Sequence, residues 1–285
     1  MQEYHHVAYR VSQLMTSHYS TSFYNASRFF RKDIRRAVFN IYGFVRLADE
    51  IVDTFHDHNK EQLLDRFVHD LEMALEEGIS LNPVLHSFAL TVRKYGIDRA
   101  HIDAFLKSMR KDLTLTAVSS KDEIHRYIHG SAEVVGLMCL KVFCDRNEAL
   151  YRELEPGAIR LGAAFQKVNF LRDLKDDTQR LHRTYFTELH NQPFSDAIKE
   201  EIVEQIKEDF RVAQRAIGRL PLGARTAVTI AYLYYRTLLK KLHRMPAARI
   251  ADERIRTGNH IKLLIIPRAI LVSSFNLWGN RLNGD

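Results

Sequence analysis

Residues 41–53 read IYGFVRLADEIVD, and this stretch decides the fold. It has no proline and one glycine, and apolar residues surround almost its whole circumference, which indicates a buried helix. Four charged residues nevertheless share roughly a 100° sector of that helix: Arg46, Asp49, Glu50 and Asp53. Buried carboxylates are costly unless they are paired or bind a metal. The sequence therefore predicts that this polar stripe either meets a buried ion pair or lines a cavity that holds cations.

The composition is that of a helical globular protein. The chain has 285 residues, of which 46% are hydrophobic and 27% charged, with 6 prolines and 12 glycines. Together with long 3.6-residue periodicities, these values predict an all-α fold. No repeat or linker rich in Gly, Ser or Pro interrupts the chain, which favours a single domain over residues 1–285. Helices are expected at about 33–54, 60–77, 83–95, 98–113, 120–138, 156–178, 195–217, 222–243 and 259–277.

The cysteines and the chain start indicate a cytoplasmic protein. Cys139 and Cys144 lie five residues apart on an apolar helix and point in different directions, so we expect no disulfide between them. The absence of a disulfide framework fits a reducing compartment. The first residues, MQEYHH, lack the basic and apolar regions of a signal peptide, and no run of 18 apolar residues predicts a transmembrane helix.

The chain is basic, with a formal net charge of +7 and a pI near 9.3. Residues 236–268 hold nine lysines and arginines and two acidic residues. Such a segment suits an anionic membrane surface, a nucleic acid or a phosphorylated substrate, or it forms a solvated face. No zinc-ligand spacing, RNA-binding aromatic motif or basic coiled coil supports nucleic-acid binding.

A second expected helix repeats the pattern of the first. Residues 166–177 read QKVNFLRDLKDD and follow a strongly apolar segment. Four polar residues of this stretch fall within roughly 80° of one another on a helical wheel: Gln166, Asn169, Asp173 and Asp177. A polar stripe thus enters a buried helix for the second time, again with an arginine nearby.

Each stripe contains an aspartate pair at positions i and i+4, Asp49 with Asp53 and Asp173 with Asp177. This spacing places two carboxylates on one helix face, about 6 Å apart along the axis. Such carboxylates can each hold Mg²⁺ while water and phosphate complete the octahedron, with arginines on the phosphate oxygens. Two separate Asp–Arg salt bridges are the alternative, but four acids side by side repel unless cations are present. Facing stripes predict two or three Mg²⁺ ions beneath a diphosphate.

Further segments can complete such a site. Ser20 and Ser22 place two hydroxyls at a helix start, where free amides bind anions, although an ordinary N-cap explains them as well. Residues 130–136 are rich in small side chains, which either leave room for a ligand or let another helix approach. The loop at 180–186 carries basic groups and a phenol that can close over an anion.

The order and spacing of these motifs resemble the squalene/phytoene synthases, the head-to-head prenyl synthases of the isoprenoid-synthase fold, over about residues 18–270. DEIVD at 49–53 resembles the first aspartate-rich motif of the family, in the form typical of phytoene synthases. NFLRDLKDD at 169–177 resembles the second motif, and YSTSF at 19–23 resembles the segment that binds diphosphate.

Two more segments carry the resemblance, with departures. Residues 127–136 are similar to the small-residue helix that lines the family's cavity, and RTYF at 183–186 is similar to its closing loop. Family members often have glycine in place of Glu133 and an aromatic residue in place of His129. A proline commonly follows the Tyr-Phe of the closing loop, where this chain has Thr187.

The resemblance implies a helical bundle around a central apolar cavity and a prenyltransferase that depends on Mg²⁺, with Mn²⁺ as a possible substitute. Catalytic roles fall on Asp49, Asp53, Asp173, Asp177, Tyr127 and Tyr235. The implied metal ligands are Asp49, Asp53, Asn169, Asp173 and Asp177. The implied substrate contacts are Ser20, Ser22, Phe23, Tyr42, Arg46, Gln166, Asn169, Arg172, Arg183 and Tyr185.

The implied reaction condenses two geranylgeranyl diphosphates head to head to phytoene through a cyclopropyl diphosphate. The alternative is squalene or dehydrosqualene from two farnesyl diphosphates, and only squalene formation needs NADPH. A catalytically inactive assembly factor, a terpene cyclase and a purely structural helical protein are further alternatives. The hydrocarbon product and the basic C-terminal segment indicate peripheral contact with the inner face of the membrane.

Overall fold

The computed structural model describes the whole chain except residues 115–119, 176–184, 187–192, 254, 256–258 and 275–285. The described residues form helices and no strand, which confirms the predicted all-α class. In chain order these helices are α1 (Gln2–Tyr19), α2 (Thr21–Ser27), α3 (Lys32–Asp53), α4 (Lys60–Glu77), α5 (Pro83–Tyr95), α6 (Arg99–Asp112), α7 (Lys121–Ile128), the π-helical turn η1 (His129–Glu133), α8 (Val134–Cys144), α9 (Glu148–Arg172), α11 (Asp196–Ile217), α12 (Leu222–Arg244), α13 (Ala247–Asp252) and α14 (Asn259–Ser274).

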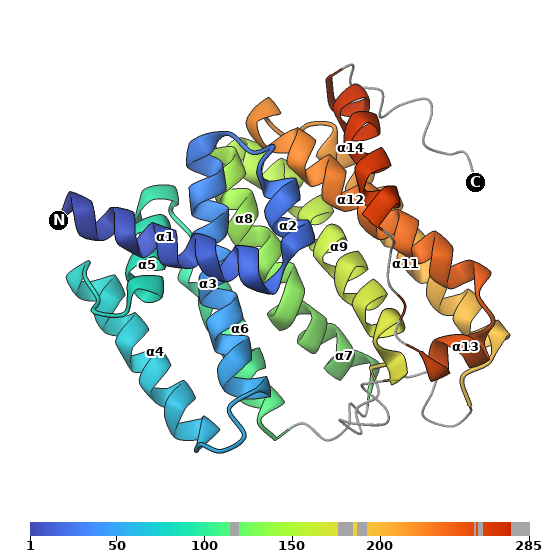
Figure 1. The fold of residues 1–285 in the computed structure, drawn as a ribbon, viewed down its shortest axis with the longest axis horizontal. Coiled ribbons are helices and arrows are strands. Elements are labelled where there is room, and N and C mark those ends of the chain that lie inside the picture. The colour runs from blue at the N-terminus through green and yellow to red at the C-terminus, as the bar shows by residue number, and fades with distance from the viewer. Residues whose placement is uncertain (115–119, 176–184, 187–192, 254, 256–258, 275–285) are drawn as a thin grey trace.

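The helix α3 holds the N-terminal half of the molecule together. It packs against α1, α4, α5, α6 and α8 (Figure 1). The ring of Phe44 stacks on that of Phe88 from α5, with centroids 4.0 Å apart, and also meets Phe67 of α4 and Phe105 of α6. Helices α8 and α9 occupy the middle of the molecule, and α11, α12 and α14 lie beyond them (Figure 1). The helix that carries the first acidic stripe is therefore a central element.

Local capping signals explain why several helix bounds were predictable. Asn59 caps α4 by accepting a hydrogen bond from the amide of Gln62, and Asn82 caps α5 in the same way ahead of Pro83. Gly78 ends α4 with a φ of +78°, a conformation that glycine adopts without strain. The predicted helices at 60–77 and 83–95 are confirmed residue for residue.

The prediction for the second acidic helix was wrong at its start, and its predicted end at residue 178 lies outside the described residues. The helix α9 begins at Glu148, eight residues before the predicted start at Pro156, because the side chain of Asn147 caps it by accepting from the amide of Leu150. It ends at Arg172, because Asp173 leaves the helical region with φ of −99° and ψ of 10°. Asp173 therefore interrupts the helix, and Leu174 and Lys175 are helical again.

The N-terminal helix α1 was not predicted, and neither were α2 and α13 as separate helices. The buried face of α1 consists of Ala8, Ser12 and Thr16, which gives no apolar periodicity to detect. Small side chains let α1 approach closely: the hydroxyl of Ser12 lies 2.9 Å from that of Ser87 on α5. A methyl group added at Gly43 of α3 would meet Ser12 at 2.8 Å. The helix α1 is therefore held by close packing of small residues and not by a face of large apolar side chains.

The segment from α7 to α8 is one helical run that contains the π-helical turn η1 and continues to Cys144, so both cysteines lie on a helix as predicted. Among the described residues, Asp122–Cys144 is the one helix long and apolar enough to cross a membrane by length and composition, a signal that counting uninterrupted apolar residues did not give. It packs against α6 and α9, and 56% of its apolar window is buried. A core helix gives the same signal. Cys139 and Cys144 in this run are free thiols, as predicted.

The small residues of this run serve helix packing. A methyl group on Gly130 would meet the carbonyl oxygen of Ala104 at 2.9 Å, and one on Gly136 would meet that of Ala158 at 3.2 Å. The same holds for Gly162 of α9, whose added methyl would lie 2.9 Å from both the carbonyl oxygen of Ala132 and the Cα of Glu133. Of the two explanations left open by the sequence, close helix approach accounts for these glycines.

Gly162→Ala is expected to lower the free energy of unfolding by about 1–3 kcal/mol, because overpacking against backbone atoms forces α9 away from η1. Gly136→Ala is the matched control, since its contact is looser and alanine gains about 1 kcal/mol of helix propensity. Urea unfolding followed by circular dichroism measures both. Equal stability changes in the two variants would contradict the assigned packing.

Candidate active site

The polar stripe of α3 divides into an ion pair and an inward-facing acid. Arg46 pairs with Glu50, which is 7% exposed, and its guanidinium carbon lies 4.4 Å from the ring centre of Tyr19. Both residues of the pair belong to one helix at i and i+4 spacing. The buried ion pair that the sequence allowed is present, but its acid is Glu50 and not one of the two motif aspartates.

Asp49 lies deep between helices and still keeps some exposed surface, which requires open space beside it. Burial and the negative charge of Asp53, with smaller contributions from Asp112 and Glu50, together raise the pKa of its carboxyl to about 7. Arg46 acts in the opposite direction. Acidic side chains from two helices, α3 and α6, are therefore gathered around one point.

Asp112 is a candidate site residue that sequence reasoning missed. It is 7% exposed at the end of α6 and accepts a hydrogen bond of 3.3 Å from the phenol of Tyr127. In the sequence it follows the basic residues Arg110 and Lys111, so no acidic motif marks it. Its helical phase was the available signal, because Phe105, Ser108, Met109 and Asp112 share the buried face of α6.

Two tyrosines connect the first acidic stripe to the second. Burial raises the pKa of Tyr42 on α3. Its phenol also interacts electrostatically with Arg46, with Asp49 and with Tyr235 of α12. Tyr235 donates a hydrogen bond of 3.3 Å to the side-chain oxygen of Asn169 on α9. The structure therefore places the two motifs on either side of one tyrosine pair.

The end of α9 brings the second motif into the same surroundings. Arg172 donates to the carboxylate of Asp173, with Nε 3.0 Å from Oδ1. Burial raises the pKa of Tyr235, whose phenol also interacts electrostatically with Arg172 and Asp173. Arginine, carboxylate, amide and phenol groups thus lie together where α9 ends.

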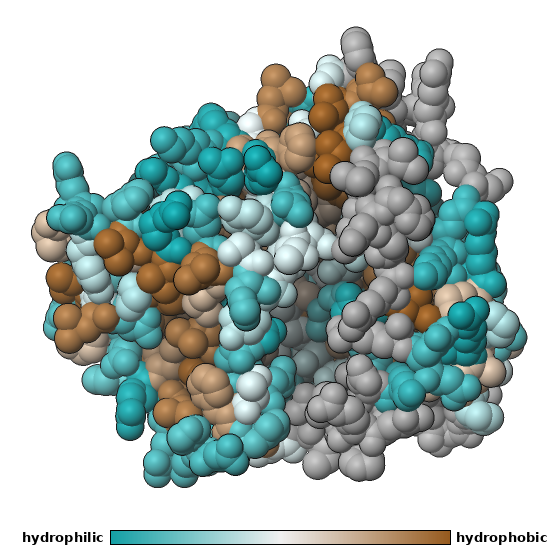
Figure 2. Space-filling view, viewed as in Figure 1, coloured by the Kyte–Doolittle hydropathy of each residue, from teal (hydrophilic) through white to brown (hydrophobic). Residues whose placement is uncertain are grey.

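Aromatic rings form the remaining walls. Tyr42 stacks on Phe23 of α2, with ring centres 5.2 Å apart, and Tyr235 stacks on Phe165 of α9 at 4.0 Å. A second stack joins Tyr185 to Phe170 at 4.1 Å and to Tyr127 at 5.2 Å. The space-filling view shows one face of the molecule hollowed near its middle (Figure 2). The polar groups and aromatic rings of both motifs form one cluster, which is termed here the active-site recess.

The comparison with known proteins decides the family. The squalene/phytoene synthase model matches residues 16–260. The chain belongs to the squalene/phytoene synthase family. Its residues are 26% identical to the phytoene synthase of Arthrospira platensis over 290 positions, which cover 93% of both chains. They are 28% identical over 242 positions to a chloroplastic phytoene synthase of an Oncidium hybrid cultivar, of which the match covers 58%, and 79% of this chain.

Solved structures of family members share the fold. The chain superposes on a dehydrosqualene synthase in complex with ligand with a TM-score of 0.82 at 20% identity, covering 96% of this chain and 99% of the other. Squalene synthase HpnC from Alicyclobacillus acidocaldarius gives 0.69 at 16% identity, covering 83% and 93%. These likenesses confirm the isoprenoid-synthase fold. The squalene/phytoene synthases are prenyltransferases that condense prenyl diphosphates head to head, which matches the family-level prediction.

Within this family member, the predicted site residues fall into three groups. Those joined by the contacts described above are Phe23, Tyr42, Arg46, Asp49, Tyr127, Asn169, Arg172, Asp173, Tyr185 and Tyr235. Ser20 hydrogen-bonds to Tyr42, whereas Asp53 lies exposed at the end of α3 and Ser22 and Gln166 are half-buried on α2 and α9. Asp177 and Arg183 lie outside the described residues.

The residues that depart from the family pattern, His129 and Glu133, contact each other. The carboxylate of Glu133 lies 2.9 Å from the ring nitrogen Nδ1 of His129, whose side chain is 49% exposed. Both residues belong to η1, so the added carboxylate has a hydrogen-bonding partner within the same turn.

No three described His, Cys, Asp or Glu side chains form a group able to hold a metal ion. The predicted ligand set also includes Asp177, which lies outside that part of the chain. The metal assignment therefore stays a prediction. Among the described residues, more acidic than basic side chains act on Asp49.

Asp49 makes the folding stability of the metal-free protein depend on pH. The folded carboxyl has a pKa of about 7 against an ordinary 3.8, so the folded state holds a proton that the unfolded chain releases. Stability is therefore full below pH 4 and falls as the pH rises to about 7. Asp49→Asn removes this loss of stability. Above pH 7, its free energy of unfolding is expected to exceed that of the parent protein by up to about 4 kcal/mol.

Urea unfolding with EDTA, at a series of pH values, measures this difference. The exposed Asp57, in the turn after α3, provides the control substitution Asp57→Asn, which should follow the parent protein at every pH. A stability gain in Asp49→Asn that is the same at pH 4 and pH 8 would show that charge at Asp49 is not its cause.

Proposed function

We propose that this chain catalyses the Mg²⁺-dependent head-to-head condensation of two geranylgeranyl diphosphates to phytoene. The observation that carries the proposal is the tyrosine pair that brings Asp49 and Arg46 of α3 into one recess with Asn169 and Arg172 of α9. The match to a phytoene synthase over 93% of both chains supports the substrate class. The single domain over residues 1–285 is part of the same proposal.

The residues present fit a divalent cation. Burial and the nearby charges of Asp53 and Asp112 raise the pKa of Asp49, and a bound cation would oppose both effects. We assign Mg²⁺ to Asp49, Asp53, Asn169, Asp173 and Asp177, since carboxylate and amide oxygens are the ligands that hard cations prefer. Bound Mg²⁺ supplies Lewis-acid neutralisation that makes diphosphate a leaving group, and Mn²⁺ can take its place.

The arginines of both motifs would hold the diphosphate. The Nε group of Arg46 is buried and has no hydrogen-bond partner among the described residues, so one donor is free for a ligand. Arg172 lies beside Tyr235 at the opposite wall. Arginine–phosphate pairs are short and charge-assisted, which fixes the diphosphate relative to the cavity. Further contacts are assigned to Ser20, Ser22, Gln166 and Arg183.

The aromatic walls would protect the carbocations. Departure of diphosphate takes the electron pair of the allylic carbon–oxygen bond, and the double bond of the acceptor attacks the cation. Loss of a proton then closes a cyclopropyl diphosphate. A second ionisation, rearrangement and proton loss give the linear hydrocarbon. The rings of Phe23, Tyr42, Tyr127 and Tyr235 can stabilise positive charge by cation–π contact, and exclusion of water prevents capture as an alcohol.

Purified protein with Mg²⁺ and geranylgeranyl diphosphate is expected to form phytoene, identified by mass spectrometry. Asp49→Asn and Asp173→Asn should each lower turnover at least about a hundredfold, the scale seen when one group that stabilises transition-state charge is removed. Asp122→Asn, exposed on α7, is the control and should keep full activity. Circular dichroism establishes that all variants fold.

The same assay separates the alternatives. Turnover of farnesyl diphosphate instead would assign dehydrosqualene or, with NADPH, squalene. If the folded protein turns over neither substrate, the proposed enzymatic activity is refuted and the assembly-factor function is favoured. Full activity in Asp49→Asn or Asp173→Asn would refute their role as metal ligands.

We also place the enzyme at the inner face of the membrane, because the basic C-terminal segment and a hydrocarbon product both favour contact with lipid. Sedimentation with anionic liposomes tests this, and absence of binding would refute it.

A further inference from the structure

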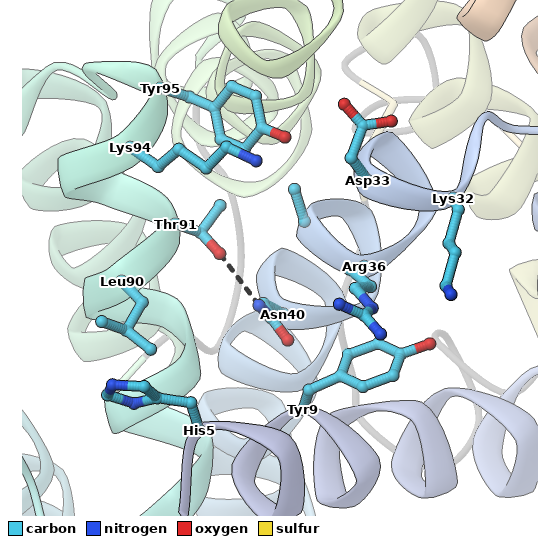
Figure 3. Close-up of a pocket in the computed structure, with 11 residues that line it drawn as sticks. His5, Tyr9, Lys32, Asp33, Arg36, Asn40, Leu90, Thr91, Lys94 and Tyr95 are labelled. Carbon is cyan, nitrogen blue, oxygen red and sulfur yellow. Dashed lines mark hydrogen bonds between the residues drawn. The ribbon is translucent and has the colours of Figure 1, made fainter. Parts of the chain in front are cut away.

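A second opening lies on the side of α3 that faces away from Asp49. It is a cavity of about 470 Å³ between α1, α3 and α5 (Figure 3). Asn40 lines it, and nine residues separate Asn40 from Asp49, which puts the two about 180° apart around the helix axis. The volume lies within the range of small-molecule sites. The cavity, termed here the α1/α3/α5 groove, is therefore separate from the active-site recess.

The lining of the groove is rich in positive charge. Lys32 and Arg36 lie one turn apart on α3, and Lys94 faces them from α5 (Figure 3). The one lining carboxylate, Asp33, already accepts two hydrogen bonds from Arg31, at 2.7 and 2.8 Å. Its charge is thus neutralised within the protein, and the three cations leave the groove suited to an anion.

A buried acceptor marks the floor of the groove. The hydroxyl of Thr91 donates to the carbonyl of Ser87 at 2.9 Å, so its oxygen must accept from the amide of Asn40, also at 2.9 Å. This fixes the side-chain orientation: the carboxamide oxygen of Asn40 points away from Thr91, to the side of Arg36 and Tyr9 (Figure 3). Asn40 is 8% exposed, and this oxygen has no partner among the described residues. A buried carboxamide oxygen without a hydrogen bond is costly, so a ligand that donates to this oxygen would be favoured.

The hydroxyl of Tyr95 is a second buried group without a partner in the described part of the chain. Tyr95 is 2% exposed, and its hydroxyl is directed toward α3 (Figure 3). The ammonium group of Lys94 lies 4.8 Å from the centre of its ring. A phenol donor beside an ammonium group favours an oxyanion at this wall.

We propose that the α1/α3/α5 groove binds a phosphate ester that carries a hydroxyl group, of the glycerol phosphate type. Arg36, Lys94 and the Tyr95 hydroxyl hold the phosphate, and the ester's hydroxyl donates to the carboxamide oxygen of Asn40. The rings of Tyr9 and Tyr95 offer apolar surface to the carbon skeleton. A free polyol phosphate and the headgroup of a glycerol-containing phospholipid share this chemistry.

Isothermal titration calorimetry of the full chain with EDTA tests the proposal, with glycerol 3-phosphate, propyl phosphate and inorganic phosphate as probes. Glycerol 3-phosphate is expected to bind most tightly, because it alone combines a phosphate with a donor for Asn40. The double variant Arg36→Ser/Lys94→Ser should bind it at least about tenfold more weakly, since two charge-assisted contacts are lost. Both side chains are exposed, so folding should be unaffected.

The variant Lys107→Ser/Arg152→Ser is the matched control, because it removes the same charge from exposed positions on α6 and α9. It should bind like the parent. Three results would overturn the proposal: no binding at millimolar ligand, equal affinity for glycerol and propyl phosphates, or loss in Arg172→Ser with none in Arg36→Ser/Lys94→Ser, which would place the ligand in the active site.

Vesicles distinguish the two sources of the ligand. Sedimentation with phosphatidylglycerol vesicles, exceeding that with phosphatidylserine vesicles of equal charge and lost in Arg36→Ser/Lys94→Ser, would assign the groove to a lipid headgroup. Binding of soluble glycerol 3-phosphate without a preference between these vesicles would assign it to a free ester. Each result supports the shared chemistry and names its source.

Discussion

Repulsion among the carboxylates at the inner face of α3 is the constraint on which the site depends. Asp49 stands within reach of Asp53, Asp112 and Glu50, and only Arg46 opposes their charge on it. Burial makes this repulsion stronger than it would be in water. A protein without a use for the arrangement would gain stability from one neutral substitution. The cation proposed for this site would relieve that repulsion.

Holding such a site requires rigid surroundings, and the packing supplies them. Phe44 ties α3 to three neighbouring helices through ring stacks. Gly162 and Gly130 let α9 and α6 approach η1 until backbone atoms meet. These contacts fix the distance between α3 and α9, and with it the distance between the two motifs. The tyrosine pair Tyr42 and Tyr235 lies between the two motifs, where Tyr42 hydrogen-bonds to Ser20 and Tyr235 to Asn169.

The helix α3 has two polar faces with different chemistry. Its C-terminal half presents acids to the recess, while its N-terminal half presents Lys32, Arg36 and Asn40 to a groove on the other side. Separation by half a turn of the helix keeps the positive groove from neutralising the acids. A single helix can thus serve two sites whose ligands carry opposite charge, a cation on one side and an anion on the other.

The sequence by itself determined the helical class, the bounds of α4 and α5, and the two acidic motifs, because caps and helical spacing are local properties. It could not determine that Arg46 pairs with Glu50, since Asp49 and Glu50 are both within its reach at i+3 and i+4. Nor could it place Asp112 beside Asp49, or bring Tyr42 to Tyr235. Helical periodicity tells which residues share a face, but only the packing of helices decides which faces meet.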